Sequence, residues 1–124
     1  MALILVVDDT ALGRMRVAKL LKAEGHTVIE ASNGEEAVDA YERYRPKMVI
    51  MDITMPRMDG LSALLAIRRL DPSAKVTMLT AMAERNTAIQ AVKLGAKDFV
   101  MKPYDSARLL SSVRRMLEGS TTNR

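Results

Sequence analysis

Short apolar runs alternate with segments of helical periodicity along the whole chain, and this alternation constrains the fold more than any other feature. The apolar runs predict five strands, over Leu3–Val7, Thr27–Ala31, Met48–Met51, Lys75–Leu79 and Asp98–Met101. The segments after them predict helices over Ala11–Glu24, residues 33–44, Leu61–Leu70, Glu84–Leu94 and from Asp105 or Ser106 to Leu117. Strands separated by helices imply right-handed crossovers and a parallel sheet covered on both faces. We therefore expect an α/β fold of three layers, α/β/α, around a five-stranded parallel sheet.

Local signals agree with several of these boundaries. Gly25 suits the position just past the end of the first helix. Asn33 can open the second helix with Glu36 as its capping-box partner, and Pro46 prevents that helix from continuing. The segment Asp52–Gly60 contains Pro56 and Gly60 and reads as a turn-rich loop.

The length and composition bound the class of protein. A chain of 124 residues fits one domain, which we place at residues 1–118, followed by a polar tail at 119–124. The absence of cysteine excludes disulfides and thiolate metal sites. The first residues carry no basic leader, and no apolar run approaches the length that spans a membrane, so we expect a cytoplasmic protein.

The net charge of +4 does not by itself indicate a nucleic-acid partner. Its basic residues lie mainly in predicted helices, where solvated faces explain them. Aromatic residues are only 3% of the chain, so a stacking platform for bases is not expected. The positive charge favours an acidic protein as partner.

Polar groups with useful chemistry follow four of the five predicted strands. Asp8 and Asp9 follow the first strand, Asp52 the third, Thr80 the fourth and Lys102 the fifth. Parallel strands end at the same edge of a sheet, where ligands of such folds bind, so we expect these groups to converge. Clustered carboxylates repel each other and suit a hard cation such as Mg²⁺, and a carboxylate can accept a phosphoryl group covalently. A lysine and a threonine hydroxyl can contact the phosphoryl oxygens.

These residues and their neighbours resemble the receiver domains of two-component response regulators, and in size and layout the single-domain CheY-like ones. The resemblance covers about Leu3 to Leu117. The matching segments are residues 5–9 (LVVDD), 51–60 (MDITMPRMDG), 79–81 (LTA), 95–99 (GAKDF) and Lys102-Pro103. The resemblance implies a flavodoxin/CheY-like strand order, 2-1-3-4-5, and a phosphorylation site at Asp52.

The resemblance also implies roles for the surrounding residues. Asp9, Asp52 and the backbone carbonyl of Thr54 would bind Mg²⁺ directly, and Asp8 would act largely through water. Lys102, Thr80 and Ala81 would contact the phosphoryl group.

A conformational switch is implied as well. Thr80 would swing toward the phosphoryl group, and Phe99 would turn inward with it. The peptide bond between Lys102 and Pro103 would be cis. The switched surface would be the fourth helix, fifth strand and fifth helix, around Phe99, Lys97 and Arg108.

The implied partners act before and after this switch. The phosphoryl donor would be a sensor histidine kinase or a histidine phosphotransfer protein. We expect it to dock at Leu12, Gly13 and Arg16, because these residues start the first helix beside Asp9. The output would be a downstream protein or a fused output domain. We expect a monomer without direct contact to nucleic acid or membrane, and dimerisation on phosphorylation is the alternative.

Two positions beside the pocket flank the path of a hydrolytic water in such domains. Here they are Thr54 and Met82. A methionine cannot orient water, so we expect a long-lived phosphorylated state.

Other readings stay open from the residues alone. A phosphatase of the haloacid dehalogenase type uses an aspartyl nucleophile but wants an Asp-x-Asp pair after its first strand. A flavin-binding module on the same fold needs more aromatic residues than one Phe and three Tyr. A receiver that has lost phosphorylation would be a scaffold, and the chain can be free-standing or the receiver of a longer protein.

Overall fold

A five-stranded parallel sheet forms the middle layer of the computed structural model, which describes residues 1–55 and 57–118. Its strands are β1 (Leu3–Val7), β2 (Thr27–Ala31), β3 (Met48–Asp52), β4 (Val76–Ala81) and β5 (Asp98–Lys102). They are ordered β2-β1-β3-β4-β5, and every neighbouring pair is parallel. The expected fold and strand order are confirmed. The predicted polar tail at 119–124 and Pro56 of the predicted loop lie outside the described residues.

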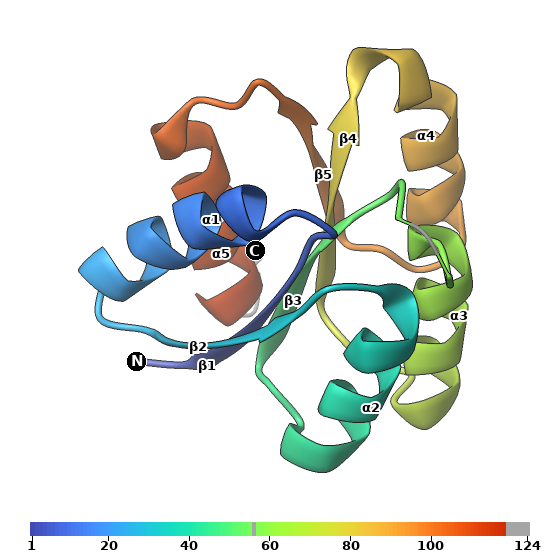
Figure 1. Ribbon diagram of the computed structural model, residues 1–124, viewed down its shortest axis with the longest axis horizontal. Helices are drawn as coiled ribbons and strands as arrows, with labels where there is room; N and C mark the ends of the chain where they lie inside the picture. Colours follow the sequence, from blue (N-terminus) through green and yellow to red (C-terminus); the bar gives the residue numbers. More distant parts are fainter. Residues whose placement is uncertain (56, 119–124) are drawn as a thin grey trace.

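Helices cover both faces of the sheet (Figure 1). The helices are α1 (Ala11–Ala23), α2 (Gly34–Tyr44), α3 (Gly60–Leu70), α4 (Arg85–Lys93) and α5 (Ser106–Glu118), with a short 3₁₀ helix η1 at Met82–Glu84. Helices α1 and α5 lie on one face, and α2, α3 and α4 lie on the other. None of the helices that the structure describes is both long and apolar enough to cross a membrane.

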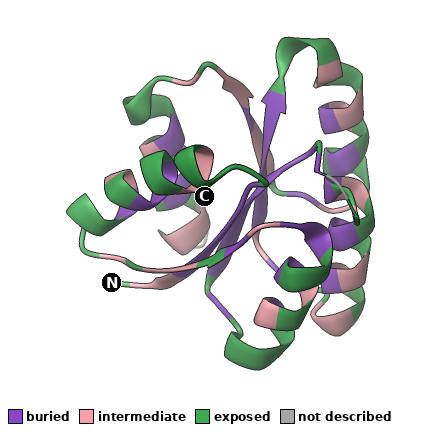
Figure 2. Ribbon diagram, viewed as in Figure 1, coloured by how far each residue is buried: buried purple, intermediate pink, exposed green. Residues whose placement is uncertain are grey.

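Each face of the sheet has its own apolar core, because successive side chains of a strand point to opposite faces. On the α1–α5 side, strand residues such as Ile4 and Ile50 pack with Leu21 and Leu109. On the opposite side, Leu5 and Met51 belong to the core that includes Leu64. Figure 2 shows buried strands and helices whose outward faces are exposed. The sheet therefore lies between two cores, which leave the carboxyl ends of its strands free to carry the functional residues.

The predicted helix caps are found with one correction. The Asn33 side chain accepts a hydrogen bond from Glu36 N at 2.9 Å and caps α2. Glu36 does not reach back to the cap residue as predicted. Its carboxylate instead accepts from Ser32 N and Ser32 Oγ, both at 2.8 Å. Gly25 follows α1 with a φ of 93°, in the left-handed region that favours glycine.

Several strands run further than the apolar pattern indicates. Asp52 and Lys102 are the last residues of their strands, and β4 continues through Thr80 to Ala81. Pairing explains the extension, because Asp52 is in register with Leu79 and Ala81 with Lys102. The polar groups of the site are thus held by strand backbone. The 3₁₀ helix that follows β4 was not predicted, since three residues carry no periodic pattern.

Candidate functional site

Three carboxylates meet where the strand order reverses. The first crossover helix, α1, lies on one face of the sheet and α2 on the other, so the ends of β1 and β3 open a crevice between them. Asp8 and Asp9 follow β1, and Asp52 ends β3. One carboxylate oxygen from each of the three lies within 4.8 Å of the other two. The convergence expected from the strand ends is confirmed.

Lys102 joins this cluster from two strands away. Its Nζ donates to Asp52 Oδ2 at 2.9 Å, although β4 lies between the two strands. The long, unbranched lysine stem makes this reach possible from the end of β5. Among the described residues, Lys102 is the only cation that forms an ion pair with Asp52. The peptide bond from Lys102 to Pro103 is cis, as the resemblance implies.

The side chain of Asp52 is 9% exposed, and its surroundings set the pKa of its carboxyl group. Loss of hydration raises the pKa of Asp52, and the hydrogen bond and charge of Lys102 offset only part of that rise. The charge of Asp8 raises the pKa further, while a backbone hydrogen bond from Thr54 lowers it. Burial would lower the pKa of Lys102, but the hydrogen bond and charge of Asp52 outweigh it, so that pKa is raised. The positive charge of Lys102 therefore does not fully compensate the buried Asp52 carboxylate.

A divalent cation could supply the missing positive charge. Asp8 and Asp52 are buried and Asp9 is exposed, so the cluster is open to solvent on one side. Mg²⁺ is bound by a small number of carboxylates and keeps several waters, which an open acidic pocket permits. A cation here would stabilise the ionised form of Asp52, whose pKa is raised mainly by burial and further by the charge of Asp8.

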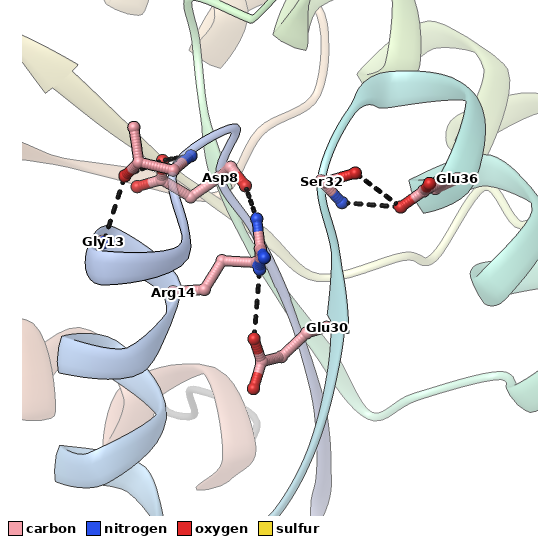
Figure 3. A network of polar contacts seen from close by, with 7 residues as sticks. Asp8, Gly13, Arg14, Glu30, Ser32 and Glu36 are labelled. Carbon is pink, nitrogen blue, oxygen red and sulfur yellow. Dashed lines mark hydrogen bonds and ion pairs between the residues drawn. The ribbon is translucent and has the colours of Figure 1, made fainter.

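The turn after β1 fixes the direction of the Asp8 side chain. Asp8 Oδ1 accepts from Thr10 N at 2.9 Å and from Thr10 Oγ1 at 3.0 Å. The Thr10 hydroxyl oxygen in turn accepts from Gly13 N at 3.1 Å and caps α1 (Figure 3). A Cβ on Gly13 would overlap Asp8 Oδ2 and lie 2.7 Å from Thr10 Oγ1. Gly13 therefore leaves room for a carboxylate of this chain, which is a physical reason for glycine that the sequence did not indicate.

The predicted switch residues lie on the same face of the sheet. Thr80 is fully buried, and its hydroxyl donates to the carbonyl of Ala81 at 3.1 Å. Phe99 is half-buried and packs on the core that includes Met78, with which it is in register. Thr80 is two residues beyond Met78 and points to that same face. In this structure the Thr80 hydroxyl is hydrogen-bonded to the backbone at the end of its own strand. Its movement toward Asp52 stays a prediction.

The two positions predicted to tune hydrolysis differ in environment. Met82 begins η1, directly after β4, and its side chain is 73% exposed. Thr54 is also exposed and lines a hollow of about 240 Å³ together with Glu84 and Thr87. Met82 is not among the residues that line that hollow. Both residues nevertheless lie just beyond strand ends of the site.

The predicted docking residues border the site. Leu12, Gly13 and Arg16 line a hollow of about 420 Å³ whose wall also contains Asp8 and Lys102. Leu12 is 53% exposed, so its apolar side chain is accessible at the rim of this hollow. The hollow lies between the start of α1 and the end of β5, so a molecule seated there reaches both strand ends of the site.

Sequence reasoning missed three residues that shape this region. Tyr104 lines the hollow and packs half-buried on the α1–α5 core. Its place after Lys102-Pro103 was a possible signal. Arg14 donates to the backbone carbonyl of Asp8 at 2.8 Å, and only the folded turn brings the two together. Thr10 was also missed, although a threonine directly before a helical segment is a helix-cap signal that could have identified it.

Comparison with known proteins agrees with this geometry. The family model described as "Response regulator receiver domain" matches residues 4–114. The chain is 43% identical over 115 residues to the chemotaxis protein CheY of Bacillus subtilis, covering 92% of this chain and 96% of that protein. It is 40% identical over 114 residues to CheY of Thermotoga maritima, covering 91% and 95%. The receiver domain of NtrX from Brucella abortus superposes with a TM-score of 0.90 at 37% identity, covering 94% of this chain and 99% of that one.

Proposed function

Since this chain belongs to the receiver domain family of two-component response regulators, we propose that Asp52 is the residue that accepts its phosphoryl group. Receiver domains are phosphoryl acceptors rather than enzymes acting on a separate substrate, which sets aside the phosphatase and flavin-binding alternatives. One observation carries the assignment to Asp52. The Asp52 carboxylate ends β3 beside two other acids, and its Oδ2 accepts a hydrogen bond from Lys102 Nζ at 2.9 Å.

The chemistry requires a carboxylate oxygen in line with a phosphorus atom. An oxygen of Asp52 attacks the phosphorus of a phosphohistidine, and the P–N bond breaks as the new P–O bond forms. The leaving imidazole keeps the electron pair of that bond and takes up a proton. Catalysis of this transfer consists mostly of positioning and of neutralising the phosphoryl oxygens.

The neutralising charges come from several strand ends. We assign the direct Mg²⁺ ligands to Asp9, Asp52 and the Thr54 carbonyl, with Asp8 acting through water. Receiver domains bind this ion at their acidic pocket, where it supplies charge to both the carboxylate and the phosphoryl group. The ammonium group of Lys102 contacts a phosphoryl oxygen from the end of β5.

The hydroxyl of Thr80 and the backbone at Ala81 complete the phosphoryl contacts. When Thr80 leaves the Ala81 carbonyl for a phosphoryl oxygen, it vacates space on the face where Phe99 packs. Phosphorylation then shifts a two-state equilibrium at the α4–β5–α5 surface, around Phe99, Lys97 and Arg108. Arg108 is placed to report this shift, since it donates to the Phe99 carbonyl at 2.9 Å. A downstream protein or a fused output domain reads the change.

The experiment that tests this function uses a small phosphoryl donor. Purified protein is incubated with acetyl phosphate and Mg²⁺, and its intact mass is measured. We expect a gain of one phosphoryl group per chain, and an unaltered mass at high donor concentration contradicts the proposal. The same result would revive the alternative of a receiver that acts only as a scaffold.

Met82→Glu is expected to shorten the lifetime of the phosphorylated protein. The wild-type methionine offers no hydrogen bond to an attacking water, whereas a carboxylate can orient one, so release should quicken about tenfold. The measurement is phosphate release after removal of the donor. Met15→Glu places the same change at another exposed methionine, in α1, and should leave release unaltered. Equal or slower release from Met82→Glu would contradict the assignment.

The α1 surface is our candidate for docking of the phosphoryl donor protein, a sensor histidine kinase or histidine phosphotransfer protein. Leu12, Gly13 and Arg16 border the site, and Arg16 also lines an adjacent groove of about 740 Å³. Lys19, Lys102 and Tyr104 line that groove, and none of its described lining residues is acidic. The charge complements an acidic surface on the donor protein.

Leu12→Asp is expected to slow phosphotransfer from the donor protein about tenfold, because it puts a charge into an apolar contact. Transfer from acetyl phosphate should keep its wild-type rate, since a small donor needs no docking surface. Leu65→Asp alters an exposed leucine on α3 and serves as the control. Equal slowing with both donors would place the defect in the pocket and contradict docking at Leu12.

The remaining assignments are a monomer, with dimerisation on phosphorylation as the alternative, and a cytoplasmic location. Gel filtration with and without acetyl phosphate distinguishes the two oligomeric states.

A further inference from the structure

Arg14 connects three segments beneath the acidic turn (Figure 3). Its Nη1 donates to the backbone carbonyl of Asp8 at 2.8 Å, and its Nε donates to Glu30 Oε1 on β2 at 3.1 Å. The Arg14 side chain is only 18% exposed, which is low for an arginine. The other described arginine pair that involves α1 and its end, Arg114 with Glu24, is 59% and 37% exposed. Arg14 is therefore set into the structure rather than lying on its surface.

We propose that Arg14 is a positioning residue for the cation site: it fixes the peptide between Asp8 and Asp9, and so the direction of both carboxylates. This inference rests on the proposed function. The Asp8 carbonyl belongs to the planar peptide unit that continues to the nitrogen of Asp9. Holding that carbonyl fixes the orientation of the whole unit, and with it the point from which the Asp9 side chain leaves the backbone.

The two acids are constrained to different degrees without Arg14. The Asp8 carboxylate has its own partners in Thr10 N and Thr10 Oγ1. Asp9 is exposed, and among the described residues no hydrogen bond orients its carboxylate. The direction of Asp9 then depends on the backbone before it. Loss of the Arg14 contact should therefore change the direction of the Asp9 side chain more than that of Asp8.

Geometry rather than charge is the main contribution of Arg14 to the site. Its charge is balanced by Glu30. The charges that act on the pKa of Asp52 come from Lys102 and Asp8. A planar guanidinium can donate to two partners in fixed directions, which the point charge of a lysine ammonium cannot reproduce. A lysine at this position would keep the charge and lose the two-way connection.

The experiment is a Mg²⁺ titration followed by ¹H–¹⁵N NMR, which reads affinity and location together. Wild type, Arg14→Ala, Arg14→Lys and Glu30→Gln are compared, with Arg114→Ala as the matched control. We expect both Arg14 variants to bind Mg²⁺ about tenfold more weakly, as is usual when a partner of a metal ligand is removed. Glu30→Gln keeps an oxygen acceptor for Arg14 and should stay near wild type, as should Arg114→Ala.

The titration separates failure of this inference from failure of the proposed function. If wild type and both Arg14 variants bind Mg²⁺ equally, or if Arg14→Ala binds it more tightly, the positioning role is wrong while the site stands. If wild type itself does not bind the ion, both proposals fall. Should Arg14→Ala not fold, the spectrum of Arg14→Lys still decides the question. The amide signals of Asp9 and Thr10 should also shift in folded Arg14 variants before any Mg²⁺ is added.

Discussion

Asp52→Asn is expected to abolish phosphorylation of this protein completely. An amide is too weak a nucleophile to attack phosphorus, although it has nearly the size and shape of the carboxylate that it replaces. The fold should persist, because the substitution also removes the charge repulsion that Asp8 exerts on this buried position. The measurement is the intact mass after incubation with acetyl phosphate and Mg²⁺.

Asp39→Asn is the matched control for this variant. Asp39 is an exposed carboxylate on α2, away from the strand ends of the site. It should be phosphorylated like wild type. A phosphoryl group on the Asp52→Asn protein would mean that another residue is the acceptor, and the central assignment would be wrong.

Lys102→Met is expected to slow phosphorylation by about 100-fold, the usual cost of removing one charged contact to a developing anion. Methionine keeps an unbranched stem of similar length, so packing at the end of β5 should change little. The ammonium group has two effects that are lost together. It stabilises the Asp52 carboxylate at 2.9 Å, and it is available to a phosphoryl oxygen.

The initial rate of mass gain at high acetyl phosphate concentration measures this effect. Lys47→Met, at an exposed position just before β3, should retain the wild-type rate. A Lys102→Met rate within about twofold of wild type would show that the ammonium does not act in the transition state.

Much of this fold follows from local pattern. Every strand and helix longer than one turn was predictable, because strands buried on both faces give short continuous apolar runs, whereas amphipathic helices give apolar residues at helical spacing. The strand order did not follow from periodicity and came from the resemblance. Boundaries at Thr80 and Lys102 were misplaced by one to two residues, since pairing with a neighbouring strand continues past the apolar run.

The site was predictable in composition and less so in detail. Asp8, Asp52 and Lys102 were found because parallel strands bring their carboxyl ends to one edge. The direction of the Thr80 hydroxyl and the room that Gly13 leaves for Asp8 depend on tertiary packing. No periodic signal carries such information.

The central claim is that the strand ends form one cation-dependent pocket around Asp52. Its most direct test is peptide mapping of the wild-type protein after acetyl phosphate, once with Mg²⁺ and once with EDTA. We predict a phosphoryl group on the peptide that contains Asp52 when Mg²⁺ is present, and an unmodified peptide with EDTA. Modification of a different peptide, or equal modification in both samples, would contradict the account.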